Sequence, residues 1–127
     1  MMKKNVIIVF CMIFSLFSCA QKQKFTSYSP AEFERLLQED ASIQLVDVRR
    51  PDEYVAGYID KAILINVQEA DFLTKAVSLL DKSKPVAVYC RGGRRSKEAA
   101  KMLTKKGFVV YELDPGYLGW LDYLKTK

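Results

Sequence analysis

A short apolar run that ends at a cysteine constrains this chain more than any other feature. Residues 85–96 read PVAVYCRGGRRS, so the run from Val86 to Tyr89 leads into Cys90, and glycines and arginines follow. Such a pattern is typical of a buried strand that ends at a loop, with a helix beginning near Ser96. Because strand–loop–helix units build parallel sheets, the stretch already favours a fold of strands alternating with helices.

The rest of the chain alternates in the same way. Ser29-Pro30-Ala31-Glu32 is a capping box with proline at the first helical position, which predicts a helix to about Glu39. Strands are expected at 43–48, 62–67, 86–89 and 108–113, and helices at 69–80, 96–106 and after the turn at 114–116, with one or two helical turns at 51–54. This order predicts an α/β fold with a central, mostly parallel β-sheet and helices on both faces.

Helical periodicity also predicts which side chains face the core. In the helix at 69–80 these are Phe72, Leu73, Ala76, Val77 and Leu80, and in the helix at 96–106 they are Ala99, Ala100, Met102 and Leu103. In the last helix we expect Tyr117, Trp120 and Tyr123 to pack in the core rather than to form a shelf for a ligand.

The N-terminus has the composition of a secretory leader. Lys3 and Lys4 precede an uncharged, almost wholly apolar segment at 6–17, which is followed by Ser18, Cys19 and Ala20. The segment holds 12 residues, whereas a transmembrane helix needs roughly 20. We therefore predict an exported protein with a signal peptide at residues 1–18.

Two processing routes fit this leader. Leu16-Phe17-Ser18-Cys19 resembles a bacterial lipobox, in which Cys19 would be lipidated and the protein would be a lipoprotein of the periplasm or cell envelope. Ordinary cleavage after Ala20 is the alternative. We expect a short linker at 19–25 and one domain at 26–127, which would contact a membrane only through a lipid anchor at Cys19.

The charge of the chain argues against one class of partner. Without residues 1–18, which hold two lysines, the 18 remaining basic residues exceed the 15 acidic ones by three. These charges are spread along the helices with acidic residues between them, whereas nucleic-acid binders concentrate them in a stripe with interleaved aromatic residues. We therefore expect no nucleic-acid partner, and we expect a monomer.

Cys90 is the only thiol of the predicted domain, because Cys11 and Cys19 lie in the leader. Ligands of open parallel sheets bind at the carboxyl ends of the strands, where Cys90 is expected. The loop glycines tolerate the dihedrals of an anion-binding nest, and the arginines and the helix dipole add positive charge. These features favour a thiolate and an anionic ligand. We predict Cys90 as the nucleophile and, as substrate-binding residues, Arg91, Gly92, Gly93, Arg94, Arg95 and Ser96.

Asp47 and Arg49 end a neighbouring expected strand. They could form a pair that supports the Cys90 loop from beneath. The alternative is an ion pair that only fixes the edge of the sheet.

Several chemistries are excluded by counting residues. The chain contains no histidine, which rules out Cys-His hydrolases and histidine-bound zinc. One cysteine in the domain leaves neither a CxxC redox pair nor an internal disulfide. Cysteine phosphatases use the spacing C-x5-R, but position 96 is Ser96. We expect neither a metal nor a cofactor.

Three segments together resemble the rhodanese family of sulfurtransferases. Residues 47–59, with Asp47-Val48-Arg49-Arg50-Pro51-Asp52-Glu53-Tyr54 and Gly57-Tyr58-Ile59, are similar to the family's first motif, DVRxPxEYxxGHIxGA. Residues 90–95, CRGGRR, resemble its active-site loop CRxGxR, and residues 114–120, DPGYLGW, resemble its closing glycine and tryptophan pattern. The departures are Tyr58 for histidine, Asp60-Lys61 for Pro-Gly, and Pro115 for the first closing glycine, so the entrance to the pocket and the choice of acceptor could differ.

The resemblance implies a rhodanese-like fold and a sulfur transfer in two half-reactions. The Cys90 thiolate would attack the outer sulfur of an anionic donor such as thiosulfate, sulfite would leave with help from the loop amides and Arg91 or Arg95, and a persulfide would remain. A thiophilic acceptor, cyanide in vitro or a thiol in the cell, would then remove the sulfur. Two alternatives stay open: a persulfide carrier with a dedicated protein acceptor, and a non-catalytic module that binds a protein partner in the cell envelope.

Overall fold

A computed structural model describes residues 24–127. The predicted signal peptide at 1–18, the candidate lipidation site Cys19 and most of the linker at 19–25 lie outside the described residues. The last linker residue, Phe25, packs against the core of the domain. Among residues 24–127, no helix is long and apolar enough to cross a membrane.

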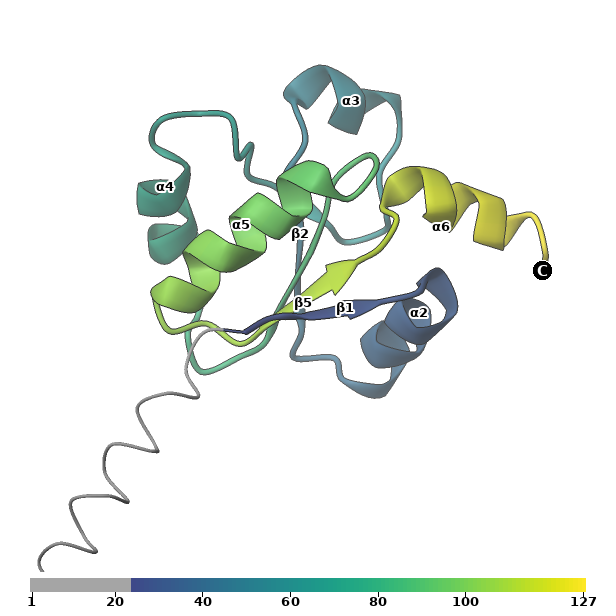
Figure 1. Cartoon of the computed structure of the whole chain (residues 1–127), viewed down its shortest axis with the longest axis horizontal. Helices are drawn as coiled ribbons and strands as arrows, with labels where there is room; N and C mark the ends of the chain where they lie inside the picture. Colours follow the sequence, from purple (N-terminus) through teal and green to yellow (C-terminus); the bar gives the residue numbers. More distant parts are fainter. Residues whose placement is uncertain (1–23) are drawn as a thin grey trace, which may run out of the picture.

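Five strands form one parallel sheet in the order β1-β5-β4-β2-β3. Figure 1 labels β1, β5 and β2 of this sheet. In chain order they are β1 (Thr26–Tyr28), β2 (Gln44–Asp47), β3 (Ile63–Leu64), β4 (Val86–Tyr89) and β5 (Val110–Leu113). The central strand β4 is buried at all four positions, as a strand covered on both faces must be.

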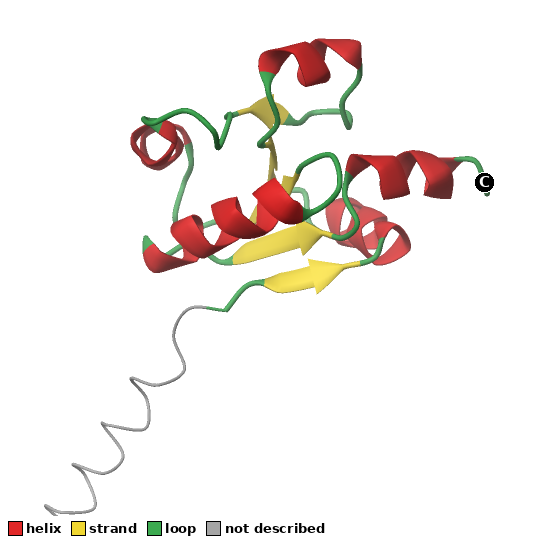
Figure 2. Cartoon of the chain, turned by 45° about the horizontal axis from the view of Figure 1, so that its top comes forward, coloured by secondary structure: helices red, strands yellow, loops and turns green. Residues whose placement is uncertain are grey.

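Helices cover both faces of the sheet, which confirms the predicted α/β class (Figure 2). They are α2 (Pro30–Glu39), α3 (Pro51–Ala56), α4 (Phe72–Leu79), α5 (Arg94–Lys105) and α6 (Tyr117–Leu124). Helices α4 and α5 pack on one face through side chains such as Phe72 and Leu103, together with Val86 and Val88 of β4. Helices α2 and α6 pack on the other face, where Phe33 meets Trp120 edge to face with 6.3 Å between the ring centroids.

The sequence missed one strand and misplaced several element ends. Strand β1 was not expected, since Thr26-Ser27-Tyr28 has no apolar run; it exists because it pairs with β5, with Ser27 opposite Glu112. Strand β3 spans two residues instead of 62–67, and α4 begins at Phe72 rather than Glu69. Helix α5 begins at Arg94, two residues earlier than expected, because Gly93 takes the N-cap position with a left-handed φ of 112°. Arg94 and Arg95 therefore belong to its first turn.

Two predicted core side chains are exposed. Val77 is 40% and Met102 is 36% accessible, so their assignment to the core was wrong. Val77 follows the buried Ala76 by one residue, and Met102 precedes the buried Leu103 by one. One residue turns a helix by about 100°, which carries both side chains to the rim of the apolar stripe.

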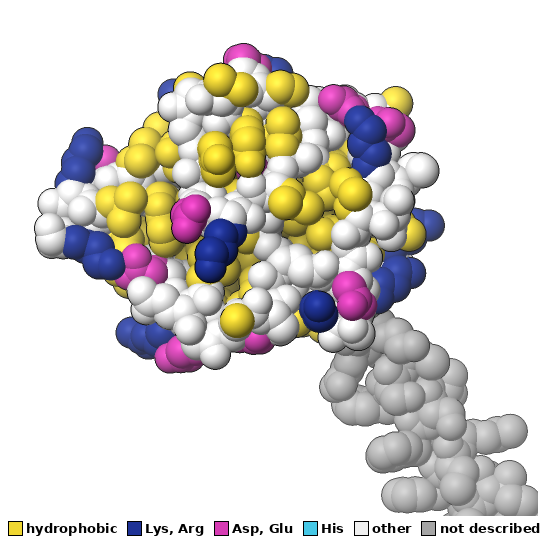
Figure 3. Space-filling view, turned by 180° about the vertical axis from the view of Figure 1, so that it is seen from behind, with side chains coloured by type: hydrophobic (Ala, Val, Ile, Leu, Met, Phe, Trp, Pro, Cys, Tyr) yellow, Lys and Arg dark blue, Asp and Glu magenta, His cyan; other side chains and the backbone are white. Residues whose placement is uncertain are grey.

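Apolar side chains also remain on the surface of the domain. Val55, Leu79 and Val109 are each more than half exposed. Figure 3 shows apolar patches on one face with charged side chains between them. Scattered exposure of this kind is ordinary for a globular domain, and we assign no binding surface to it.

Candidate active site

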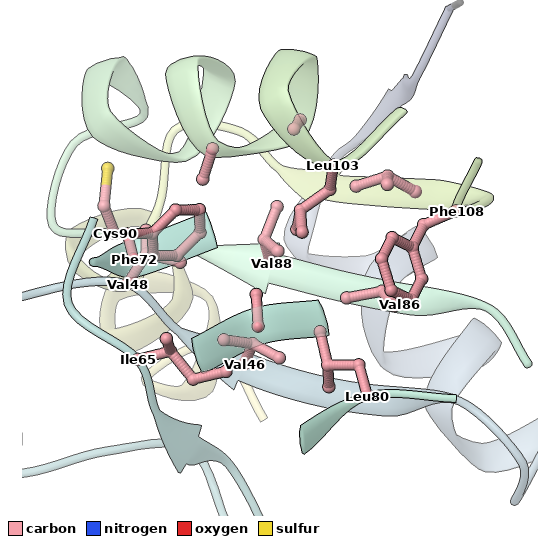
Figure 4. Packing of buried hydrophobic residues seen from close by; sticks show 14 residues of the cluster. Val46, Val48, Ile65, Phe72, Leu80, Val86, Val88, Cys90, Leu103 and Phe108 are labelled. Carbon is pink, nitrogen blue, oxygen red and sulfur yellow. The ribbon is translucent and has the colours of Figure 1, made fainter. Parts of the chain in front are cut away.

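Cys90 lies directly after β4, at the carboxyl edge of the sheet. The residue is 1% accessible, and its sulfur points toward the N-terminal end of α5 (Figure 4). The backbone N–H of Gly93 donates a hydrogen bond to Cys90 Sγ over 3.1 Å. A hydrogen-bond donor and the positive end of a helix both favour the thiolate form of a cysteine.

The first residues of α6 hold the Cys90 loop in place. The backbone N–H of Tyr117 donates to the carbonyl oxygen of Cys90 at 2.8 Å, and that of Leu118 donates to Arg91 at 3.1 Å. Gly116 has a left-handed φ of 92° and lies so close that a Cβ atom there would be 2.7 Å from the Arg91 carbonyl oxygen. The closing segment of the chain therefore packs against the loop with no room for a side chain.

A pocket of about 550 Å³ opens beside the cysteine. Its lining consists of Gln68, Cys90, Arg91, Gly92, Arg94, Arg95 and Glu98. Arg91 and Arg94 are exposed, and neither takes part in an ion pair among residues 24–127. Gly93 and Ser96 are buried and lie behind the sulfur instead of in the pocket wall. The pocket thus places the sulfur near two arginines that have no ion-pair partner among residues 24–127, with one acidic side chain, Glu98, in the same lining.

Arg95 differs from the other two arginines because it is paired. Its Nη1 and Nη2 atoms donate to the two carboxylate oxygens of Glu53 at 2.7 and 2.9 Å. Glu53 also accepts the backbone N–H of Arg50 and so caps α3. This carboxylate was not among the predicted site residues, although it lies within the first motif. The pair joins α3 to the first turn of α5.

The Glu53–Arg95 pair gives an expected pH dependence of stability. The hydrogen bonds from Arg95 hold the pKa of Glu53 at about 2, against the usual 4.5. Because the folded-state pKa is the lower one, the stabilisation is complete above about pH 4.5 and is lost as the pH falls toward 2. We expect Glu53→Gln to remove the part of the stability that the wild type loses in this window, about 2 kcal/mol. The measurement is the free energy of unfolding in urea as a function of pH.

A matched control is available on α2. Glu39 is exposed and forms no ion pair within the described part of the chain, so Glu39→Gln should keep the wild-type slope of stability against pH. Equal slopes for wild type and Glu53→Gln would contradict the assignment.

Asp47 and Arg49 form the predicted ion pair. Arg49 Nη2 lies 2.7 Å from Asp47 Oδ2, and both side chains are buried. The Arg49 guanidinium also stacks over the Tyr117 ring, 4.4 Å from its centroid. The Tyr117 N–H in turn donates to the Cys90 carbonyl, so Tyr117 lies between this pair and the Cys90 loop.

Behind the sulfur, the predicted site residue Ser96 is joined to Glu112 and Lys97, two residues that the sequence did not assign to the site. Ser96 Oγ is 3.5 Å from Cys90 Sγ and 2.7 Å from Glu112 Oε2, and Lys97 Nζ is 3.3 Å from the same carboxylate oxygen. A signal existed for Glu112: it is the one charged residue in the run FVVYEL, which was expected to be a buried strand. A charge in such a strand must find partners.

Comparison with known proteins adds family evidence. Residues 29–123 match the family model described as the rhodanese-like domain. A thiosulfate sulfurtransferase of Shewanella oneidensis is 34% identical over 99 residues, which cover 75% of this chain and 94% of the relative. A tRNA uridine(34) hydroxylase of Pelagibacter ubique is 32% identical over 109 residues, covering 85% of this chain but only 36% of that protein.

Solved structures agree with this family likeness. The crystal structure of a rhodanese-related protein from Thermoplasma volcanium superposes with a TM-score of 0.68 at 26% identity, covering 78% of this chain and 93% of that one. Its match spans nearly the whole of the other chain, so the likeness includes the arrangement of the sheet and its helices.

Proposed function

The chain belongs to the rhodanese-like domain family, and from that premise we propose that it is a sulfurtransferase that works through a persulfide on Cys90. The sulfur donor is a small anion such as thiosulfate. The acceptor is a thiophilic nucleophile, cyanide in vitro and a thiol in the cell.

One observation carries the proposal. Cys90 is the only cysteine among residues 24–127, and its sulfur accepts a backbone N–H beside a pocket that contains the unpaired Arg91 and Arg94. A thiolate is the nucleophile that sulfur transfer needs, and the arginines offer charge to the donor and to the leaving anion. The Shewanella relative, which this chain matches over almost its whole length, supports the choice of thiosulfate.

The two half-reactions balance without a cofactor. The Cys90 thiolate attacks the outer sulfur of thiosulfate, the sulfur–sulfur bond of the donor breaks, and its electron pair leaves with sulfite. A persulfide anion remains on Cys90. Cyanide then attacks the terminal sulfur, thiocyanate leaves, and the thiolate is regenerated.

The test is thiocyanate production by the purified protein with thiosulfate and cyanide both varied. Double-displacement chemistry should give parallel lines in double-reciprocal plots, as ping-pong kinetics require. Sulfur uptake without turnover would favour a persulfide carrier with a dedicated acceptor. Neither uptake nor turnover in folded, reduced protein would favour a non-catalytic binding module and overturn the proposal.

Arg91 gives a prediction about donor binding. Because Arg91 is exposed in the pocket and has no carboxylate partner in the described chain, we expect Arg91→Ala to raise the KM for thiosulfate about tenfold, which corresponds to about 1.4 kcal/mol. Arg35→Ala on α2 removes the same charge from the opposite face of the sheet and should leave the KM within about twofold, since salt screens distant surface charges. Equal effects of the two variants would mean that only net charge matters.

The location of the protein is a separate proposal. We propose export to the bacterial cell envelope with lipidation at Cys19, which rests on the basic start, the apolar segment at 6–17 and the lipobox-like Leu16-Phe17-Ser18-Cys19. Bacteria that express the full chain should incorporate labelled palmitate into it, and Cys19→Ser should abolish the label. An unlabelled, exported product that begins at Gln21 would support cleavage after Ala20 instead.

A further inference from the structure

Glu112 is a fully buried carboxylate that the proposed reaction does not use. It lies on β5 with an accessibility of 0%, between Ser27 of β1 and Val88 of β4 in the sheet register. Its Oε1 atom accepts a hydrogen bond from Ser27 Oγ at 2.6 Å. Burying a carboxylate is costly unless its oxygens are satisfied, so its position behind the only thiol of the described chain calls for an explanation.

Ser96 connects this carboxylate to the cysteine. Ser96 Oγ lies 2.7 Å from Glu112 Oε2 and 3.5 Å from Cys90 Sγ, and all three residues are buried. A serine hydroxyl has one proton, and its shortest contact is the one to Glu112. With that proton directed to Glu112, the lone pairs of Ser96 Oγ face Cys90, so the thiol S–H donates to Ser96 Oγ. The three groups form a continuous path for a proton.

The other charged groups around this path leave Glu112 only partly compensated. Lys97 of α5 reaches Glu112 Oε2 at 3.3 Å, but the lysine is 39% exposed and is shared with Asp114, which follows β5, at 3.1 Å. Although burial alone would lower the pKa of Lys97, the hydrogen bond to Asp114 and the charge of Glu112 raise it, so Lys97 stays protonated. On the thiol side, Arg95 is bound to Glu53, while Arg91 and Arg94 line the pocket beside Cys90. Within the described chain, none of these arginines forms an ion pair with Glu112.

We propose that Glu112 accepts the proton of the Cys90 thiol through the Ser96 hydroxyl, and that it is a positioning residue for formation of the thiolate. The inference rests on the proposed function, because sulfur transfer starts from that thiolate. The S–H bond of Cys90 breaks as a new O–H bond forms on Ser96, and the original Ser96 proton moves to Glu112 Oε2. No charge leaves the site, and no external base is needed in a chain without histidine.

The product of this shift is stabilised by the same groups. The Ser96 hydroxyl now donates to the thiolate, which also accepts the Gly93 N–H at 3.1 Å. The neutral Glu112 donates to Ser96 Oγ and keeps its hydrogen bond with Ser27. Because the proton stays inside the site, the ratio of thiolate to thiol should not depend on pH between the two macroscopic titrations of the pair.

The test measures the thiolate by its ultraviolet absorbance as a function of pH, using the full chain. Subtraction of the Cys90→Ser spectrum removes the contributions of the tyrosines and of Cys11 and Cys19. In the wild type we expect a flat region in which the thiolate-to-thiol ratio changes by less than about twofold over two pH units. In Glu112→Gln, which keeps the shape of the side chain but cannot take the proton, the ratio should change about tenfold per pH unit.

Two further variants separate proton transfer from a structural role. Ser96→Ala breaks the path and should remove the flat region as Glu112→Gln does. Ser27→Ala removes the hydrogen bond to Glu112 Oε1 but leaves the path from Cys90 through Ser96 to Oε2 intact, so it should keep the flat region. Two results would overturn the proposal. The first is a wild-type thiolate-to-thiol ratio that changes about tenfold per pH unit throughout, which can be measured even if a variant fails to fold. The second is a flat region that survives in folded Glu112→Gln.

The measurement needs no sulfur donor, so the proposed function is tested separately. Turnover without a flat region would reject the role of Glu112 and leave the sulfurtransferase proposal standing. A flat region without turnover or sulfur uptake would reject the sulfurtransferase and keep the proton path.

Discussion

Cys90→Ser should lower thiosulfate-dependent thiocyanate production at least about 10³-fold, to the level of the buffer. A serine hydroxyl is not ionised near neutral pH and cannot carry a persulfide, so the first half-reaction loses its nucleophile and the second loses the persulfide that cyanide attacks. The substitution exchanges one small side chain for another, and the Gly93 N–H retains an acceptor. The variant should therefore fold, which circular dichroism and urea unfolding would check.

The matched control for this loss is Cys11→Ser. Cys11 lies in the expected signal peptide and takes no part in the proposed reaction, so its replacement should leave turnover within about twofold of the wild type. Residual turnover above a few per cent in folded Cys90→Ser would contradict the assignment of Cys90 as the sulfur carrier.

Gly116→Ala should impair both folding and activity. A Cβ atom at this position would lie 2.7 Å from the Arg91 carbonyl oxygen and 2.8 Å from that of Cys90, and the residue has a left-handed φ of 92°. Backbone atoms cannot give way as a flexible side chain does, so the loop must shift away from α6. We expect a loss of about 2 to 4 kcal/mol in the free energy of unfolding. We also expect at least a tenfold loss of kcat/KM, since small displacements of a nucleophile are costly.

Gly107→Ala separates the clash from the backbone strain. Gly107 has a similar φ of 96°, but a Cβ atom there would meet nothing within 4 Å. The control should therefore lose only about 1 kcal/mol in the free energy of unfolding, from strain alone. Its turnover should equal that of the wild type. If the two alanine variants behaved alike, the packing of Gly116 against the loop would not matter for the site.

The part of the site that could be predicted from the sequence is the part that is contiguous in the chain. The run from Val86 to Gly93 contains the buried strand, the nucleophile and the glycines of the turn, so the position of Cys90 at the sheet edge followed from local pattern alone. The Asp47–Arg49 pair was also predictable, because both residues end one strand and carry opposite charges two positions apart.

The unpredicted part depends on contacts between distant segments. Glu53 and Arg95 are 42 residues apart, and only the packing of α3 near α5 shows that this arginine is bound to a carboxylate rather than free for the donor. Strand β1 was missed for a related reason: its three residues have little strand character of their own and become a strand by pairing with β5. Since β1 was missed, the Ser27–Glu112 contact could not be foreseen either.

The central claim is that Cys90 carries the sulfur between the two half-reactions. Intact mass spectrometry of the reduced protein after incubation with thiosulfate tests it most directly. We expect a gain of one sulfur atom that is absent in Cys90→Ser and is removed by cyanide with formation of thiocyanate. A folded, reduced wild-type protein that gains no sulfur, or that gains it equally in Cys90→Ser, would contradict the claim.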